Sequence, residues 1–448
     1  MRTPSPSRRA LLAVALAVAA GPLAACGSGR GEQAGNTPSD PAGSATAGTT
    51  SPAPGVPAGT AAAGAAAVQD AGAALFRAAA TAAPGDLALS PLSVHLALAM
   101  TALGARGATA REFAAVLHAP DAGRQARDLN ALVAHLRGLA RPVPIGDGET
   151  FQPRFDLADA LWGQRGLPWS APYLAALSTG FGAALRQADF TTAADAARRE
   201  INAWVAGTTH DTVPELLPAG AVTADSRLVL VNALYLKARW QQTFTRTAPG
   251  DFTRGDGRRV QAQLMHLEAP VRYGTGPGWQ AVQLRYLAPG GGTEPFPGYA
   301  MTLVLPDPGR MPDLVAGLDG ARLRHVLAAP APAALTLTVP RWRTRTAVAL
   351  ADVLAGLGLR TAFTRDADFS GMTTSPQGLA IDAVRHQGYV SVDENGTEAS
   401  AATSVEMGMS GVIPQREVTF DRPFLYVIHD VPTATPLFLG RVDDPSAA

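Results

Sequence analysis

Residues 397–410 alternate in side-chain character as a β-strand does when one face is buried and the other is wet. Successive side chains of a strand point to opposite faces of its sheet. The odd-numbered positions are small or apolar: Thr397, Ala399, Ala401, Thr403, Val405, Met407 and Met409. The even-numbered positions are mostly polar: Glu398, Ser400, Ala402, Ser404, Glu406 and Ser410. Because such small side chains nucleate a strand poorly, the pattern favours a segment held outside a sheet until something frees it, although an ordinary edge strand followed by a surface loop predicts the same alternation.

The chain from about residue 68 onwards has helical patterns first and strand patterns later. Apolar residues recur at helical spacing from Val68 to Phe76, and Thr109 followed by Glu112 has the spacing of a capping box that opens a helix. Further helices are expected over 93–103, 109–117 and 201–205, and strands over 228–236, 300–305, 335–339, 388–392 and 424–429. Strands and helices do not alternate regularly, so we expect an α+β fold with a large antiparallel or mixed sheet and a helical cluster on one face.

The N-terminus has the order of an export signal, because three arginines precede an apolar run over residues 10–20. This run is too short to span a membrane, which takes roughly 20 apolar residues. Residues 23–27 read LAACG and are similar to the lipobox of bacterial lipoproteins, with Cys26 as the lipidated residue. Cys26 is the only cysteine, so it cannot form an internal disulfide. We therefore expect a lipoprotein signal peptide over residues 1–25, with a simple cleaved secretion signal as the alternative.

Residues 26–66 consist mainly of Gly, Ala, Ser, Thr and Pro. With almost no bulky apolar side chain, this segment cannot bury enough surface to offset the entropy of ordering it. We expect a disordered tether there and a folded domain over residues 67–445. With a lipid on Cys26, the chain is expected to be an exported lipoprotein, at the cell surface or in the periplasm, held to the extracellular side of a membrane.

Charge and histidine spacing exclude several classes of function. The formal net charge is zero and Lys237 is the only lysine, so no basic face for nucleic acid is expected. The eight histidines are scattered without metal-ligand spacing, so neither a metal nor a cofactor is expected. The sequence GMSG at 408–411 hints at a nucleophile elbow, but Val412 stands where the second glycine is required. A hydrolase or solute-binding lipoprotein is therefore disfavoured, and we do not expect an enzyme.

Six segments, taken together and in order, resemble one family, the serpins. They are LSPLS at 89–93, INAWV at 201–205, LVNALYLK at 230–237, DFSG at 368–371, RPF at 422–424 and PLFLGRV at 436–442. The resemblance covers nearly all of the expected globular part. It implies the serpin fold, with a large central mixed β-sheet, smaller sheets, a helical cluster and an exposed reactive-centre loop. It also implies a monomer that inhibits serine, or cysteine, proteases by inserting that loop after cleavage.

Residues 392–407 match the hinge and reactive loop of inhibitory serpins almost residue for residue. By this resemblance the hinge consists of Glu394, Gly396, Thr397, Glu398, Ala399, Ser400, Ala401 and Ala402. Gly396 would give the bend its φ freedom, and Thr397 would be the first side chain to enter the sheet. A charge buried on the inward face would cost several kcal/mol and stall insertion, and no inward position carries one. The hinge therefore predicts inhibition, the alternative being a non-inhibitory serpin that acts as a binding module.

The resemblance also assigns two supporting groups of residues. A hydrogen-bonded gate under the opening sheet would consist of Ser90, Ser93, Asn232 and His386. Trp240 would lie beneath the point where the loop enters the sheet, and Arg341 would form an ion pair with Glu394 at the end of the strand.

The scissile bond is placed by counting from either side of the loop. Counting forward from Glu394 by the family's usual interval puts it after Ser410, before Gly411. Counting back from residues 417–420 puts it after Val412, before Ile413, so the window runs from Met409 to Ile413. This window has no Arg or Lys, which disfavours trypsin-like targets and favours elastase-, subtilisin- or chymotrypsin-like serine proteases as covalent acyl partners. The sequence leaves open the target, the exact bond and the membrane that carries the anchor.

Overall fold

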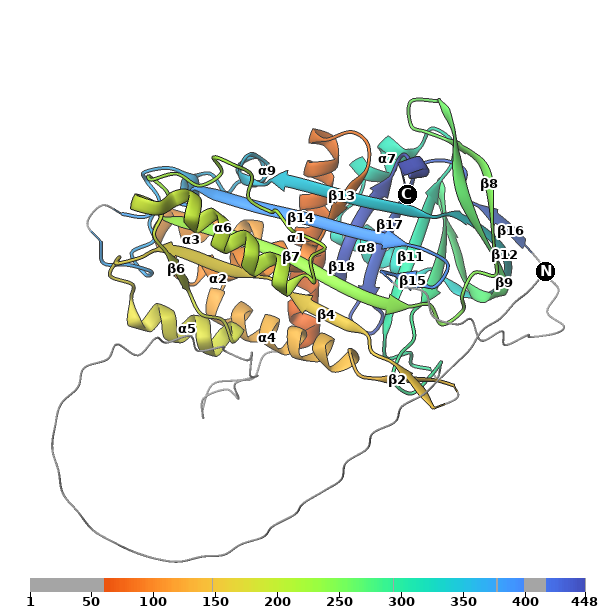
Figure 1. Cartoon of the computed structure of the whole chain (residues 1–448), viewed down its shortest axis with the longest axis horizontal. Coiled ribbons are helices and arrows are strands. Elements are labelled where there is room, and N and C mark those ends of the chain that lie inside the picture. The colour runs from red at the N-terminus through yellow and green to blue at the C-terminus, as the bar shows by residue number, and fades with distance from the viewer. Residues whose placement is uncertain (1–59, 147, 293, 376–377, 399–415, 448) are drawn as a thin grey trace, which may run out of the picture. The chain divides into compact units, whose positions relative to one another are not determined.

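The computed structural model describes residues 60–146, 148–292, 294–375, 378–398 and 416–447. The expected signal peptide, Cys26, residues 399–402 of the hinge and the cleavage window at 409–413 lie outside these ranges. The described residues form two large sheets, a short hairpin, nine α-helices and two short 3-10 helices, Thr361–Phe363 and Pro445–Ala447 (Figure 1).

The seven-stranded sheet, called here the main sheet, runs in the order β13-β14-β15-β7-β5-β6, with β4 also paired to β7. The bounds are β4 Arg154–Leu157, β5 Ala160–Gln164, β6 Arg186–Ala188, β7 Leu228–Arg239, β13 Trp342–Ala349, β14 Ala383–Val392 and β15 Gly396–Thr397. The sheet is mixed, because β14 with β7 and β5 with β6 are parallel while the other pairs are antiparallel. At one end β14 pairs directly with β7, and at the other end β15 lies between them.

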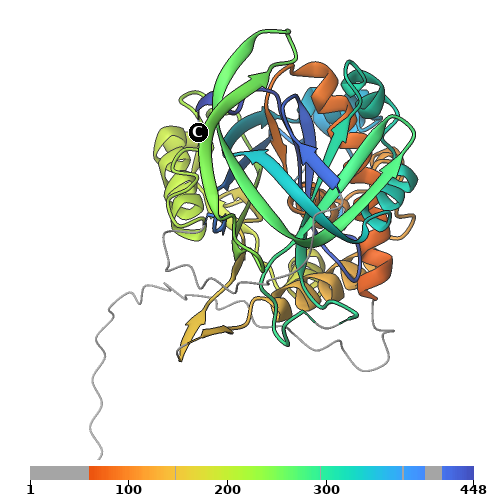
Figure 2. The same cartoon turned by 90° about the vertical axis from the view of Figure 1, so that its right-hand side faces the viewer.

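The second sheet has nine strands in the order β1-β18-β17-β11-β10-β9-β12-β16, with β8 on β9. The bounds are β1 Leu87–Leu89, β8 Arg246–Thr253, β9 Arg259–Gly276, β10 Trp279–Arg285, β11 Tyr299–Pro306, β12 Ala331–Pro340, β16 Arg416–Thr419, β17 Phe424–Asp430 and β18 Pro436–Val442. Figure 2 views the end of the molecule that β8, β9, β12 and β16 form. A separate hairpin consists of β2 (Val143–Gly146) and β3 (Glu149–Phe151).

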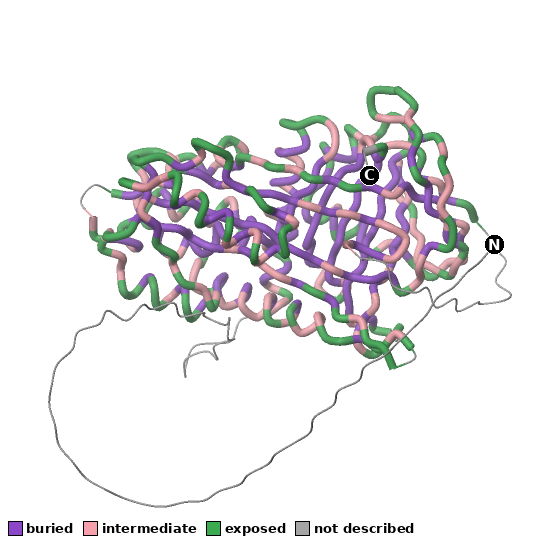
Figure 3. Tube along the Cα trace, viewed as in Figure 1, coloured by how far each residue is buried: buried purple, intermediate pink, exposed green. Residues whose placement is uncertain are grey.

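Helices cover both faces of the main sheet (Figures 1 and 3). The bounds are α1 Ala61–Ala82, α2 Pro91–Ala102, α3 Gly107–Val116, α4 Ala122–Leu139, α5 Ala171–Phe181, α6 Phe190–Thr208, α7 Met311–Ala316, α8 Gly320–Ala328 and α9 Ala351–Gly356. Helix α2 is buried along its whole length, including its polar residues Ser93, His95 and Thr101. Within the described ranges, no helix combines the length and the hydrophobicity that a membrane span requires.

Strand β7 shows why both faces are covered. Its even-numbered residues Leu230 and Leu234 belong to the core that contains α2, whereas Val229 and Val231 pack with Ile201 of α6. Because both faces are buried, the strand is a nearly continuous apolar run instead of an alternating one. The expected α+β fold with a large mixed sheet is confirmed, and the β-rich runs of the sequence all lie in strands of the two sheets.

The expected boundary between tether and domain is wrong by several residues. Helix α1 begins at Ala61, so residues 61–66 are helical. Thr60 caps this helix by accepting a hydrogen bond from the Ala63 N–H at 3.2 Å, and its own N–H donates to Asp128 Oδ1 at 2.8 Å. A Cβ atom on Gly64 would lie 2.8 Å from the carbonyl oxygen of Asp128. Small side chains let α1 approach α4 closely, an effect that counting bulky apolar residues does not detect.

The capping box expected at Thr109 and Glu112 is also wrong. Helix α3 begins two residues earlier, at Gly107, and no side chain caps it. Thr109 Oγ1 instead accepts from the Asp368 N–H at 3.0 Å, and Glu112 Oε2 accepts from the N–H groups of Arg360 and Thr361 at 2.9 and 2.8 Å. Both side chains therefore join α3 to a segment some 250 residues later in the chain.

Candidate functional site

The first two residues of the expected loop insertion are already in the main sheet. Gly396 pairs with Arg239 of β7, and Thr397 pairs with Ala238 of β7 and with Val392 of β14. The expectation that the whole segment is held outside a sheet is therefore wrong for Gly396 and Thr397. Beyond residue 398, the segment lies outside the described residues until 416.

Gly396 is needed for space and not for φ freedom. It lies in β15, and a Cβ atom there would lie 2.0 Å from the Ala238 carbonyl oxygen. Among the hinge residues that the structure describes, the positive φ belongs to Glu398, at 51°. The expected role of Gly396 is corrected in this respect, because its missing side chain lets β15 lie against β7.

Thr397 is buried and binds an aromatic pair. Its Oγ1 lies 2.6 Å from the hydroxyl of Tyr286. The Tyr286 ring stacks on Trp240, with ring centres 4.4 Å apart and 11° between the planes. Trp240 in turn holds the chain just before Thr397, since its Nε1 donates to Asp393 O at 3.0 Å and its backbone N–H to Asn395 O at 2.8 Å. Trp240 thus lies at the point where the chain enters the sheet, where the sequence placed it.

Glu394 and Arg341 form the expected ion pair. Arg341 Nη2 lies 2.6 Å from Oε1 and 2.7 Å from Oε2 of Glu394, and Thr247 also donates to this carboxylate. Burial acts to raise the pKa of Glu394, but the hydrogen bonds from Thr247 and Arg341 outweigh it and lower the pKa. The pair fixes the end of β14 beside β12, immediately before the hinge turns into the sheet.

The four expected gate residues meet beneath the main sheet, and all are buried. His386 Nε2 accepts from the Ser90 N–H at 3.0 Å, and His386 Nδ1 lies 2.6 Å from Asn232 Oδ1. His386 is therefore neutral with its proton on Nδ1, and burial lowers its pKa to about 4. Ser90 also caps α2, because its Oγ accepts from the Ser93 N–H at 3.3 Å. The backbone N–H of Ser90 at the start of α2, His386 of β14 and Asn232 of β7 are thus joined where β14 and β7 pair directly.

Asp159 is a member of this cluster that the sequence reasoning missed. Ser93 Oγ donates to Asp159 Oδ1 at 2.5 Å, and burial raises the pKa of Asp159 well above its usual value. The register of β4 and β5 on β7 places Asp159 opposite Asn232. Among the described residues, Asp159 Oδ2 and Asn232 Nδ2 are both buried without a partner. The available signal was an acidic residue inside the apolar run at 157–162.

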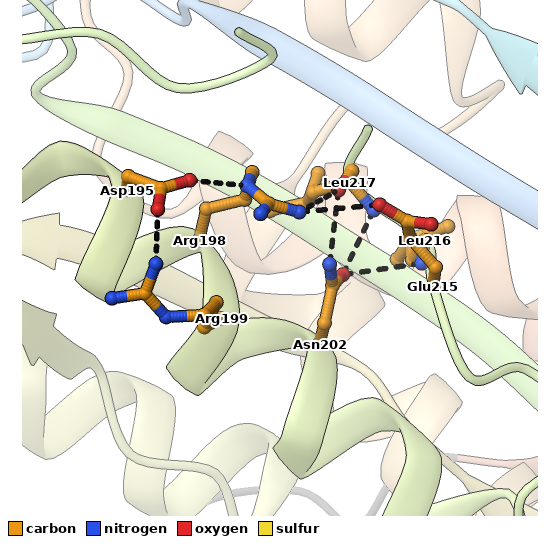
Figure 4. A network of polar contacts seen from close by, with 7 residues as sticks. All are labelled: Asp195, Arg198, Arg199, Asn202, Glu215, Leu216 and Leu217. Carbon is orange, nitrogen blue, oxygen red and sulfur yellow. Dashed lines mark hydrogen bonds and ion pairs between the residues drawn. The ribbon is translucent and has the colours of Figure 1, made fainter. Parts of the chain in front are cut away.

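Helix α6 is held to its own following segment on the opposite face of the sheet (Figure 4). Asn202 Oδ1 accepts from the N–H groups of Leu216 and Leu217 at 3.1 and 2.9 Å, and Asn202 Nδ2 donates to Leu217 O at 2.9 Å. Arg198, one turn earlier, donates to the same carbonyl oxygen at 3.2 Å. This contact keeps α6 above β5 and β7, beside the gap that another strand would fill.

The described residues offer no other candidate chemistry at this site. Within them, no group of three or more His, Cys, Asp or Glu side chains is arranged to hold a metal ion. The hinge positions Ala399, Ser400, Ala401 and Ala402 and the bond candidates from Met409 to Ile413 are outside the described ranges, so they stay predictions.

A family model described as Serpin (serine protease inhibitor) matches residues 66–445. The leukocyte elastase inhibitor of Equus caballus is 31% identical over 83% of this chain and 96% of that protein. An uncharacterized serpin-like protein of Thermococcus kodakarensis is 31% identical over 80% of each chain. Both relatives therefore extend over most of the chain.

Solved structures agree on the fold. The thermophilic serpin tengpin in its native state has a TM-score of 0.73 at 24% identity, over 84% of this chain and 93% of that one. Uncleaved ovalbumin has a TM-score of 0.73 at 23% identity, over 85% and 99% of the two chains. By its sequence match, its fold and the geometry of its hinge, this chain belongs to the serpin family of serine protease inhibitors.

Proposed function

We propose that this serpin inhibits its target protease by completing the insertion that β15 begins. The observation that carries the proposal is the position of Gly396 and Thr397, hydrogen-bonded between β14 and β7. The protease serine attacks the carbonyl carbon of the scissile bond, the amine of the next residue leaves with a proton, and an ester joins loop and protease. About 14 inserted residues at roughly 3.3 Å each would carry the protease some tens of ångströms and distort its catalytic geometry before water hydrolyses the ester.

The register of β15 supports a specific course for the inserted strand. Continued from the pairs at Thr397, it would bring Thr403 opposite both Asn232 and His386, which are themselves register partners. The direct contact between Asn232 and His386 would break, and the Thr403 hydroxyl can accept from one and donate to the other. The odd-numbered side chains would face the core that contains α2, as Thr397 does.

We propose elastase-like, subtilisin-like or chymotrypsin-like serine proteases as targets. The window from Met409 to Ile413 supports this choice, because it offers small or medium apolar side chains and no Arg or Lys. The names of relatives such as the leukocyte elastase inhibitor of Equus caballus agree with an elastase-like target.

The test is to incubate the protein with an elastase, a subtilisin and a chymotrypsin and to look for a complex that survives denaturing electrophoresis. Sequencing the released C-terminal peptide then identifies the bond. A hinge variant, Thr397→Arg, is expected to be cleaved without forming the complex, because its charge cannot be buried beside Tyr286. If the unmodified protein is cleaved without forming a covalent complex, it is a substrate and not an inhibitor. The alternative of a non-inhibitory serpin that acts as a binding module would then be favoured.

The proposed location is the extracellular side of a membrane, through a lipid on Cys26. The sequence LAACG at 23–27 supports it, and residues 27–59 are long enough to let the domain stand some tens of ångströms away from the bilayer. We further propose that the inhibitor acts as a monomer. Metabolic labelling with a radioactive fatty acid should mark the protein and fail for Cys26→Ala, and sedimentation equilibrium should give the mass of one chain.

A further inference from the structure

The hinge strand ends abruptly after Thr397. The next residue, Glu398, has φ 51°, a left-handed conformation that non-glycine residues seldom adopt. Its backbone N–H still donates to Ser391 O of β14 at 3.0 Å. The chain is therefore in contact with the gap when it turns out of the strand, and something must hold Glu398 in this conformation.

The side chain of Glu398 is held on the face of the sheet opposite to Thr397. The Tyr235 hydroxyl, from β7, donates a hydrogen bond to its carboxylate, and Lys237, Arg343 and Arg345 are close enough to attract it. These cations come from β7 and β13, on either side of the hinge. The other carboxylate oxygen, Oε1, is buried and has no partner among the described residues.

Tyr235 is itself held from the end of α6. The ring of His210 lies 4.8 Å from the Tyr235 ring, and His210 Nε2 lies 3.0 Å from Asp156 Oδ2 on β4. His210 lies just after Thr209, the C-cap residue of α6, and has φ 50°. A short chain of contacts therefore leads from the end of α6 through Tyr235 to the hinge.

We infer that Tyr235 and Glu398 are positioning residues for loop insertion, because their hydrogen bond stops the hinge strand after Thr397 in the uncleaved protein. His210 supports this stop by keeping the Tyr235 ring in place. The inference rests on the proposed insertion mechanism, but it concerns the position of the hinge before any protease arrives.

Protonation of Glu398 affects this stop. Burial raises the pKa of Glu398 to about 7 from an ordinary 4.5, although Tyr235 and the three cations act to lower it. The held carboxyl therefore keeps a proton that a released Glu398 would lose between about pH 4.5 and 7, so the stop is strongest below about pH 4.5, weakens as the pH rises from there, and has lost this contribution above about pH 7. The charged and titratable groups that face Glu398 and Tyr235 are Lys237, Arg343, Arg345, Arg154, Asp156 and His210.

The test uses the full, uncleaved chain without protease. Trp240 lies under the hinge, so the fluorescence difference between the protein and its Trp240→Phe variant reports hinge position. We expect a step that begins above about pH 4.5 and is complete near pH 7, and no step in Glu398→Gln, whose side chain cannot ionise. A step of equal size in Glu398→Gln would overturn the inference, since another group would then cause it.

Amide hydrogen exchange of residues 393–398 gives a second measurement, independent of the Trp240 variant. At pH 6, Tyr235→Phe should accelerate exchange of the Gly396 and Thr397 amides at least tenfold, because the ring stays but the hydrogen bond is lost. The matched control is Tyr389→Phe, which changes a half-buried tyrosine of β14 and should leave this exchange unchanged. Equal exchange in the two variants would refute the stop. Neither readout needs a protease. If the protein shows the step but forms no covalent complex with a protease, the proposed inhibition is wrong while the inference about the hinge stands.

Discussion

Single residues in this protein act mainly through the placement of protons and hydrogen bonds under the main sheet. His386 is neutral because it is buried, and its neutral ring both donates to Asn232 and accepts from the Ser90 N–H. Asp159 is buried opposite Asn232, with one oxygen satisfied by Ser93. Folding lowers the pKa of His386 and raises the pKa of Asp159, so the two side chains change the free energy of unfolding in opposite directions as the pH rises.

His386 should make the protein less stable in mild acid. Its pKa is about 4 in the folded protein against an ordinary 6.5, so the unfolded chain binds a proton that the folded one refuses. The stabilisation that follows from this pKa difference is complete above pH 6.5. As the pH falls from 6.5 to about 4, the free energy of unfolding should lose about 3 kcal/mol on account of His386. Urea unfolding from pH 4 to 7 should show a shallower decline for His386→Gln, and identical slopes would contradict this assignment. His95 and His429 also have lowered pKa values, so only the difference between the two proteins is diagnostic.

Asp159 should have the opposite effect. Its folded pKa is raised, so the folded protein retains a proton that the unfolded chain releases, and stability falls as the pH rises above about 4. Asp159→Asn keeps the acceptor for Ser93 without the ionisable group. We expect this variant to be more stable than the original at pH 7 and to lose the advantage near pH 3. Asp313→Asn, on an exposed side chain of α7, is the control and should have little effect.

At the scale of elements, α6 has to stay above the main sheet while a strand is added beneath it. Asn202, in the C-terminal half of the helix, binds residues 216–217, and the end of the helix is followed by the contact between His210 and Asp156. The apolar residues under it, such as Val231, pack with Ile201 and Val205. Both polar contacts are therefore suited to keep the helix in register during insertion.

Replacing Asn202 by alanine should weaken this hold. The variant leaves the N–H groups of Leu216 and Leu217 without their acceptor, and such a loss costs about 1–3 kcal/mol. We expect a lower free energy of unfolding and faster hydrogen exchange in α6. Glu215→Ala removes only an exposed partner of Arg198 and should change stability by less than about 1 kcal/mol. Equal losses in the two variants would argue against a special role for Asn202.

At the scale of the whole molecule, the uncleaved fold leaves a place for one more strand. The gap between β14 and β7 is filled by two residues at one end and closed by direct pairing at the other. The strand that could fill it is present in the same chain, at residues 398–410. The uncleaved form is therefore expected to be less stable than a form with the strand inserted.

Cleavage within 409–413 should raise the melting temperature of the protein. Insertion adds a ladder of backbone hydrogen bonds on both sides of the new strand and buries its small inward side chains. Calorimetry before and after limited proteolysis measures the change, and Thr397→Arg, cleaved in the same way, should show little or none. An unchanged melting temperature in the cleaved original protein would rule out the loop-insertion mechanism.

The sequence by itself determined the α+β class and the positions of five strands, β7, β11, β12, β14 and β17, because these depend on local periodicity. It also placed Glu394 with Arg341 and the four gate residues together, through family resemblance. Only the tertiary structure decided that Thr397 is already inserted, that Gly396 serves close approach, and that Asp159 joins the gate. It also showed helix α1 starting at Ala61, and Thr109 and Glu112 binding a distant segment. These features depend on which side chains and backbone atoms meet across strands and helices far apart in the chain, and no local pattern records such distances.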